Sequence, residues 1–212
     1  MVVDNILFDF NGTLVNDLEL CLNLLNDMLV YCKHNRVSKE EYLNIFTFPV
    51  IEYYKKAGFV FPKDDFDSLA KYFIKEYSRL NKYCPLQDGV IEILEYLKSC
   101  NKTLSVVSAS EINLLNSQLE MYDIKKYFIG ISGLDNINAM SKIETAKRYI
   151  KEKDFDLNKT VLIGDTLHDE EVANALGVKC ILLAQGHQSK EVLSTSNSLI
   201  IDNLLELKKY IK

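Results

Sequence analysis

The sequence opens on a short apolar run that ends in a carboxylate. Residues 6–8 form the kind of run that a parallel sheet buries on both faces, and Asp9 follows with no polar residue between. A carboxylate there is expected to be shielded from water. Gly12 then allows a sharp turn with exposed backbone amides, a shape that can hold an anion. Because Asp, Asn and Gly are also ordinary turn residues, a capped strand and an anion-binding loop both remain open at this point.

The composition excludes several classes of protein. The chain has 212 residues, of which 48% are hydrophobic and 26% charged, as in globular proteins. No apolar run approaches a membrane span, and the first four residues lack the basic start of a secretion signal, so we expect a cytoplasmic protein without a membrane partner. A net charge of −5 without a long basic run argues against nucleic acid as the main partner. Five scattered cysteines, none in a Cys-x-x-Cys pair, predict reduced and mostly buried thiols.

The segment 17–82 has helical spacing throughout. Apolar residues recur three or four positions apart in 17–34, which predicts one amphipathic helix, and three more helices should follow. The N-terminal signals of the four helices are Asp17, Ser38, Pro49, and Asp64 or Asp65. The many tyrosines and phenylalanines of this segment are expected mainly to fill the core of a small helical bundle.

From Pro85 onward the pattern alternates between helix and strand. Helices are predicted at 88–99, 110–122 and 141–153, and strands at 103–107, 127–131, 160–163, 180–183 and 199–201. Together with the opening strand, they predict an α/β fold with a parallel sheet wound on both faces. The helical segment is then an insertion. Residues 1–16 and 84–212 should form the core domain and residues 17–83 a helical cap domain, with hinges at the two boundaries.

The residues that follow the predicted strands carry the chemistry. In an open parallel sheet, ligands bind beyond the carboxyl ends of the strands. Asp9, Ser108 and Asp165 each follow a predicted strand closely, Asp169 lies one helical turn further on, and Lys142 stands at the start of a predicted helix. Carboxylates, a hydroxyl and an ammonium at one mouth suit a divalent cation and a phosphate. Any one of them could be only a cap, but their joint placement favours a site.

With these residues in place, the sequence resembles the haloacid dehalogenase superfamily. Residues 9–15 look like its first motif, 106–108 like the second, Lys142 like the third and 164–169 like the fourth. The resemblance covers nearly the whole chain and is nearest to the capped phosphatases of the phosphoglycolate phosphatase and β-phosphoglucomutase branch. It implies a Rossmann-like parallel sheet core with an inserted all-helical cap. It is a poor guide to the substrate.

The resemblance also implies roles for individual residues. Asp9 would be the nucleophile that forms an aspartyl-phosphate. Mg²⁺ would be held by Asp9, by Asp165 and by the backbone carbonyl of Asn11. Lys142 could pair with Asp9 in the resting enzyme. Asp169 would support the metal through water or anchor Lys142, although an aspartate is also favourable in the first turn of any helix.

Further residues are implied in phosphate binding. The catalytic candidates are Asp9, Asn11, Ser108 and Lys142. The candidates for binding the phosphoryl oxygens are Gly12, Thr13, Ser108, Ala109 and Lys142. His168 lies within the fourth motif and is a supporting candidate.

Asn11 departs from the family pattern, because related ester hydrolases usually carry an aspartate there as acid and base. An amide cannot exchange that proton, and losing general acid–base catalysis typically costs about 10²- to 10⁴-fold. The protein could be slow, or act on good leaving groups such as acyl phosphates. His168 or His187 near the rim could supply the proton, the residue could be an introduced substitution, or Asn11-Gly12 could deamidate. Restoring the acid with Asn11→Asp is expected to raise turnover of esters.

The leading hypothesis is a magnesium-dependent phosphatase of a small phosphorylated metabolite, working as a monomer or weak dimer. A helical lid suits small substrates, and the connection 45–52 holds candidate substrate-facing positions. A carbon–halogen hydrolase fits less well, because such relatives need no metal whereas Asp165 and Asp169 are present. A phosphonate hydrolase would need a cap lysine, and Lys55 and Lys56 fit a solvated face better. The alternative from another class is a catalytically weak phospho-ligand sensor or interaction protein.

Overall fold

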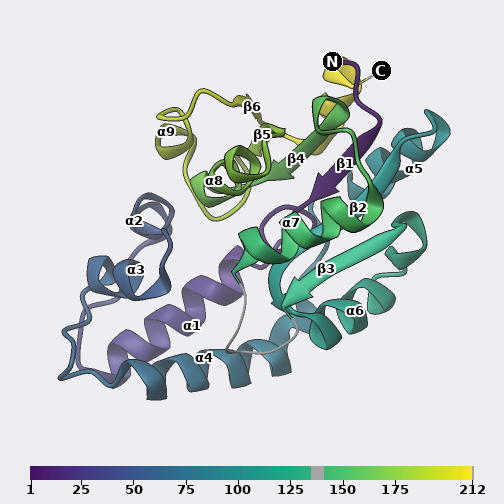
Figure 1. Cartoon of the computed structure of the whole chain (residues 1–212). Coiled ribbons are helices and arrows are strands. Elements are labelled where there is room, and N and C mark those ends of the chain that lie inside the picture. Colours follow the sequence, from purple (N-terminus) through teal and green to yellow (C-terminus); the bar gives the residue numbers. More distant parts are fainter. Residues whose placement is uncertain (135–140, 212) are drawn as a thin grey trace.

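The computed structural model describes residues 1–134 and 141–211 (Figure 1). Within these residues lies a six-stranded sheet of order β3-β2-β1-β4-β5-β6, in which every neighbouring pair is parallel. The strands are β1 (Asn5–Phe8), β2 (Thr103–Glu111), β3 (Gly130–Leu134), β4 (Thr160–Gly164), β5 (Lys179–Leu183) and β6 (Leu199–Ile201). The predicted α/β class with a Rossmann-like parallel sheet is confirmed.

Helices pack on both faces of the sheet. They are α5 (Val90–Ser99), α6 (Ile112–Met121), α7 (Lys142–Lys153), α8 (Leu167–Leu176), α9 (Lys190–Leu193) and α10 (Leu207–Tyr210). Alternate residues of β1 point to opposite faces, as the pleat requires. Ile6 and Phe8 share a buried cluster with residues of α5, α6 and α10, whereas Leu7 lies in a cluster with residues of α7 and α8. β1 is therefore buried on both faces, as its uninterrupted apolar run predicts.

The predicted boundaries of two strands were wrong in this half of the chain. β2 runs four residues beyond Val107, because it pairs with β3 again at Glu111 after a register shift. Ser108 therefore lies inside the strand rather than after it, and α6 begins at Ile112. β3 begins at Gly130, because Lys125–Tyr127 forms a short 3₁₀ helix ahead of it.

The segment between β1 and α5 is helical. It contains α1 (Leu18–Tyr31), α2 (Lys39–Ile45), α3 (Val50–Ala57) and α4 (Phe66–Leu80). These helices enclose a buried cluster of their own, which includes Tyr42, Tyr53, Tyr54 and Tyr77. The expected core role of the aromatic residues is confirmed for these four. Figure 1 shows α1 and α4 side by side, with α2 and α3 beyond them.

The start signals of the four helices differ in how they act. Ser38 forms the predicted capping box with Glu41, and the side chain of Asp65 accepts hydrogen bonds from the first turn of α4. Pro49 immediately precedes α3. Asp17 is the N-cap residue of α1, but its side chain makes no capping hydrogen bond. Its carboxylate instead accepts hydrogen bonds from residues outside α1.

The two chain segments that join the helices to the sheet are hydrogen-bonded to each other. The amide of Asn16 donates to the carbonyl of Pro85, and the amide of Gln87 donates to that of Leu14, both at 2.9 Å. The division into a core of 1–16 and 84–212 and a cap of 17–83 remains a prediction. Its core includes residues 135–140 and 212, which lie outside the described part of the chain.

Two composition-based expectations can be compared with the structure. The five cysteines are free, but only Cys21 and Cys84 are buried and the other three are half-buried, so the expectation of mostly buried thiols was wrong. The half-buried ones are the C-cap residues of α1 and α5 and a residue near the start of β5, where neighbours cover only part of the side chain. None of the described helices is long and apolar enough to cross a membrane.

Candidate active site

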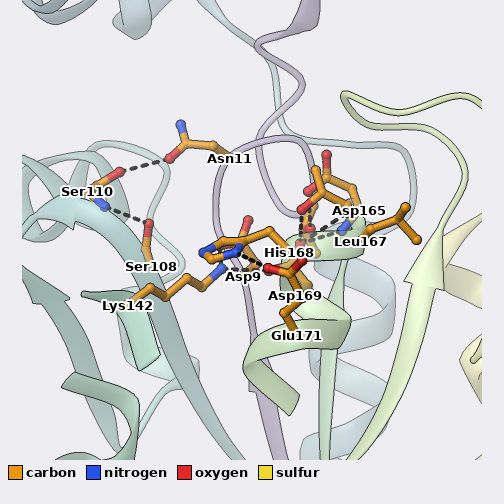
Figure 2. Close-up of polar contacts among 12 residues, drawn as sticks. Asp9, Asn11, Ser108, Ser110, Lys142, Asp165, Leu167, His168, Asp169 and Glu171 are labelled. Carbon is orange, nitrogen blue, oxygen red and sulfur yellow. Dashed lines mark hydrogen bonds and ion pairs between the residues drawn. The ribbon is translucent and has the colours of Figure 1, made fainter. Parts of the chain in front are cut away.

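The carboxyl ends of three adjacent strands bring the predicted site residues together. Phe8 of β1 is in register with Val106 of β2 and with Ile163 of β4. The chain therefore delivers Asp9 and Asp165, each just beyond its neighbouring strand, to the same edge of the sheet, with Ser108 of β2 beside them. Figure 2 shows these side chains converging from their separate elements. All three are at most 6% exposed.

Lys142 joins two carboxylates of this group. Its ammonium contacts Oδ1 of Asp9 and lies 2.6 Å from Oδ1 of Asp169, and all three side chains are buried. Lys142 is the first residue of α7, whose start is fixed by the predicted capping box of Ser141 and Glu144. The capping box that starts α7 thus helps to position Lys142, although both of its carboxylate partners are distant in the sequence.

Asp169 holds the other side of that ion pair. Its Oδ2 accepts the hydroxyl of Thr166 at 2.8 Å and the amides of Thr166 and Asp165 at 3.1 and 3.2 Å. The carboxylate therefore both caps α8 and anchors Lys142. Of the two roles expected for Asp169, direct support of Lys142 is the one visible in these contacts.

Asp165 is fixed by groups from two other loops. Its Oδ1 accepts the hydroxyl of Thr13 at 3.1 Å, and its Oδ2 accepts the amide of His187 at 2.7 Å. The close approach of Asp165 and His187 to the opening loop requires a residue without a side chain at position 12. A Cβ on Gly12 would lie 2.2 Å from Asp165 Oδ2 and 2.7 Å from His187 Cδ2, and its φ of 73° is one that glycine adopts readily.

The electrostatics of the site favour a bound cation. Burial raises the pKa of Asp9, against the lowering effect of Lys142 and with added repulsion from Asp169 and Asp165. Burial likewise raises the pKa of Asp165 to about 6, although a positive His187 opposes it. Burial also acts to raise the pKa of Asp169, but its ion pair with Lys142 wins and holds the pKa below its usual range. Three carboxylates thus share one ammonium.

The donor set fits a divalent metal ion. Asp9, Asp165 and Asp169 are buried, and each offers an oxygen within 4.8 Å of the others. Oxygen donors from carboxylates are those that Mg²⁺ prefers. Oδ1 of Asp169 is paired with Lys142 and its Oδ2 accepts three hydrogen bonds, whereas each oxygen of Asp165 accepts one hydrogen bond in the described part of the chain. Asp9 and Asp165 are therefore better suited than Asp169 as direct ligands.

The family assignment rests on most of the chain. The family model for haloacid dehalogenase-like hydrolases matches residues 6–183, from β1 through β5. The chain belongs to the haloacid dehalogenase-like hydrolase family. The resemblance inferred from the four motifs is thereby confirmed.

Individual relatives are distant in sequence and similar in fold. The chain is 23% identical over 137 residues to phosphoglycolate phosphatase 1 of Pseudomonas aeruginosa, covering 64% of this chain and 50% of that protein. It is 21% identical over 180 residues to pyrophosphatase PpaX of Halalkalibacterium halodurans, covering 84% and 82%. A haloacid dehalogenase-like hydrolase from Streptococcus pneumoniae superposes with a TM-score of 0.84 at 19% identity, over 99% and 98%. The match thus spans about half the length of the phosphoglycolate phosphatase.

In the opening loop, Gly12 and Thr13 make hydrogen bonds within the protein, whereas the sequence suggests that they bind phosphate. The amide of Gly12 donates to Asp17 Oδ1 at 3.0 Å and to the carbonyl of Val15 at 2.9 Å, and the hydroxyl of Thr13 is committed to Asp165. Both groups therefore already have protein partners. Ser108 Oγ accepts the amide of Ser110 at 3.1 Å. The predicted phosphate-binding roles of these residues remain predictions.

Asn11 is held by three side chains. Its Nδ2 donates to Asp17 Oδ2 at 2.9 Å and to the hydroxyl of Tyr77 at 2.5 Å. Its Oδ1 accepts the hydroxyl of Ser110 at 2.8 Å, the contact that Figure 2 shows. This opposes deamidation, which needs the amide nitrogen of Gly12 to attack the Asn11 side chain. That nitrogen is already bound to two acceptors, and the side chain is pinned.

The two candidate histidines occupy different surroundings. His168 is half-buried, pairs with Glu171 at 3.0 Å, and packs its ring on that of Phe48 with centroids 4.7 Å apart. His187 is only 4% exposed, so its expected place at the rim was wrong. Its loop folds inward because α2 packs over it: the hydroxyl of Tyr42 bonds Nδ1 at 2.8 Å, and the ring of Phe46 stacks on the imidazole.

The sequence reading did not single out three polar residues that surround Asn11. Asp17 was read only as a cap, and Ser110 and Tyr77 were given no role in the site. One signal was available for Asp17. It lies four residues before Cys21, on the apolar face of the predicted helix, where a carboxylate must find buried partners.

Proposed function

We propose that this protein is a phosphatase of a small phosphorylated metabolite, acting with Mg²⁺ through a phosphorylated Asp9, in the cytoplasm and as a monomer or weak dimer. The observation that carries the proposal is the buried group of Asp9, Asp165, Asp169 and Lys142 at one edge of the parallel sheet. The family and the phosphoglycolate phosphatase and pyrophosphatase relatives support this class of reaction.

Two displacements at phosphorus make up the reaction. An oxygen of the Asp9 carboxylate attacks phosphorus, the bond between phosphorus and the leaving oxygen breaks, and the leaving group takes up a proton. Water then attacks the phosphorus of the acyl phosphate, inorganic phosphate departs, and the Asp9 carboxylate is restored. Burial raises the pKa of Asp9 to about 8, and the positive charges of Lys142 and of a bound Mg²⁺ would favour the ionised form that attacks phosphorus.

The surrounding residues divide the remaining work. Asp9, Asp165 and the backbone carbonyl of Asn11 would hold Mg²⁺, which supplies positive charge against the repulsion between a carboxylate and a phosphate. Lys142, steadied by Asp169, remains close enough to Asp9 to neutralise a phosphoryl group bound there. Ser108 lies at the same strand edge and would donate to a phosphoryl oxygen.

Proton transfer to the leaving group is the weakest part of this site. Asn11 has no proton to exchange, and both ring nitrogens of His187 are engaged by Asp17 and Tyr42. Substrates with good leaving groups, such as acyl phosphates and phosphoanhydrides, therefore suit this chain better than simple alkyl esters. The relative named as a pyrophosphatase agrees with this preference.

The helical segment limits the size of the substrate. The connection between α2 and α3 lies against the site, because Phe46 contacts His187 and Phe48 contacts His168. Aromatic rings that close over a phosphate site exclude water and leave space for a small molecule.

A panel of phosphorylated metabolites tests the proposal directly. It should include phosphomonoesters, acyl phosphates and pyrophosphate, with phosphate release measured in the presence of Mg²⁺. We expect release from at least one of them, its loss in Asp9→Asn, and its loss on chelation of the metal. Full activity in Asp9→Asn would overturn the mechanism. If no compound releases phosphate but some of them raise the Tm, the alternative of a catalytically weak phospho-ligand sensor is favoured instead.

A further inference from the structure

Asp17 is a buried carboxylate that the proposed reaction does not use. It stands at the N-cap position of α1 without making a capping bond, and it is 1% exposed. Its Oδ1 accepts the amide of Gly12 at 3.0 Å and faces Nε2 of His187 at 3.1 Å. Its Oδ2 accepts Nδ2 of Asn11 at 2.9 Å and the hydroxyl of Tyr77 at 2.7 Å. Asn11 and Gly12 of the opening loop, Tyr77 of α4 and His187 of a third segment thus meet on one carboxylate.

These contacts decide which way the amide of Asn11 points. A carboxylate without a proton can only accept hydrogen bonds, so the Nδ2 group must face Asp17 and Oδ1 must face the hydroxyl of Ser110. The amide of Ser110 in turn donates to Ser108 Oγ at 3.1 Å. A continuous chain of hydrogen bonds therefore runs from Asp17 through Asn11 and Ser110 to Ser108, and Figure 2 shows its last two links.

The amide and the carboxylate of this chain depend on each other. An aspartate at position 11 in the same conformation would place an oxygen where Nδ2 now lies, within 3 Å of Asp17 Oδ2. Two carboxylates at that distance, one of them buried and the other half-buried, repel each other unless they share a proton. The geometry therefore predicts that Asn11→Asp alone lowers turnover instead of raising it, because the carboxylate of Asp17 requires a hydrogen-bond donor at position 11.

We propose that Asp17 is a positioning residue for the active site: it fixes Asn11 and, through Ser110, the phosphate-binding Ser108. This inference rests on the proposed function, since it assigns Asp17 a part in the same reaction. Asp17 follows the opening loop and begins the helical segment. The orientation of Asn11 therefore depends on how that segment sits on the sheet.

A double-mutant cycle tests the match. The variants are Asn11→Asp, Asp17→Asn and the exchanged double variant, assayed with p-nitrophenyl phosphate and Mg²⁺. The leaving group of this substrate needs no proton, so an acid gained at position 11 cannot conceal a loss of positioning. We expect each single variant to lose about 10-fold or more in kcat/KM, with a rise in KM, and the double variant to recover most of it, as for residues in direct contact.

Two further readouts separate positioning from simple structural damage. The defect of Asn11→Asp should shrink as the pH is lowered, because a proton shared by the two carboxylates replaces the missing amide hydrogen. Asp27→Asn, the same substitution at an exposed aspartate of α1, should leave kcat and KM within about twofold of the wild type.

Urea unfolding of the wild type and the three variants of the cycle measures the coupling between Asn11 and Asp17 without an activity assay. If the wild type releases no phosphate, the proposed function fails, while non-additive unfolding in the cycle would still support the coupling of Asn11 and Asp17. If the wild type is active and the double variant is as impaired as the two single changes combined, the positioning role is overturned and the phosphatase stands.

Discussion

Two clusters of buried polar side chains meet at Gly12, and they balance their charges in opposite ways. The acidic cluster of Asp9, Asp165, Asp169 and Lys142 sets three carboxylates against one ammonium. In the Asp17 cluster, made of Asp17, His187, Asn11 and Tyr77, one carboxylate is surrounded by donors from the other three residues and by the amide of Gly12.

The charge states of the second cluster complete this contrast. Burial lowers the pKa of His187, but Asp17 outweighs it and raises the pKa to about 9. Burial raises the pKa of Asp17, and the positive His187 with three hydrogen bonds reverses that to a lowered value. The Asp17 cluster therefore supplies its own cation, although Asp17, His187 and the nearby Cys21 are close enough to hold a metal. Of the two clusters, the acidic one is where the carboxylates outnumber the cations of the cluster itself.

The largest predicted effect is on the acidic cluster. Asp165→Asn should lower kcat/KM by at least about 100-fold and remove the rise in Tm that Mg²⁺ gives the wild type, because it deletes a proposed metal ligand. Differential scanning fluorimetry with and without Mg²⁺ measures the second effect. A normal response to Mg²⁺ in Asp165→Asn would show that the acidic cluster is not the metal site.

An intermediate effect is expected at Lys142. Lys142→Met leaves the carboxylates of Asp9 and Asp169 buried without their cation and should cost about 3–5 kcal/mol of unfolding free energy, as for other broken buried ion pairs. Urea denaturation measures it, and saturating Mg²⁺ should make the loss smaller. Lys190→Met, at an exposed ion pair with Asp202, is the matched control and should cost less than about 1 kcal/mol. Equal losses in both variants would contradict the prediction.

The smallest effect is a pH dependence of the Asp17 cluster. The folded-state pKa of His187, about 9, exceeds its ordinary value of 6.5. The folded state thus holds an extra proton between these pH values, and the contribution to stability is complete below pH 6.5 and lost as the pH rises through 9. We expect the free energy of unfolding to fall over this window by roughly 1–3 kcal/mol more in the wild type than in His187→Gln. If the free energy of unfolding changes in parallel with pH in the two proteins, the ion pair between His187 and Asp17 is refuted.

The acidic cluster was predictable from sequence and the Asp17 cluster was not, for a physical reason. Asp9 and Asp165 directly follow strands whose parallel pairing aligns their ends, so their meeting follows from the class of fold. The partners of Asp17 include Tyr77 and His187, which are 60 and 170 positions away and carry no motif. Only the packing of the helical segment on the sheet brings them together. Ser108 was misplaced for a similar reason, since the extension of β2 depends on pairing with β3.

The hydrogen bonds between the two connecting segments limit how the helical segment can move. Asn16 is tied to Pro85 and Gln87 to Leu14 through backbone groups, so neither segment can bend without carrying the other. A motion of the helical segment that keeps both bonds would move the two connecting segments together, as one hinge axis. Since Asp17 begins directly after this axis, even a small rotation would be felt first at the carboxylate that holds Asn11. Opening of the lid and release of the site would then be a single kinetic event.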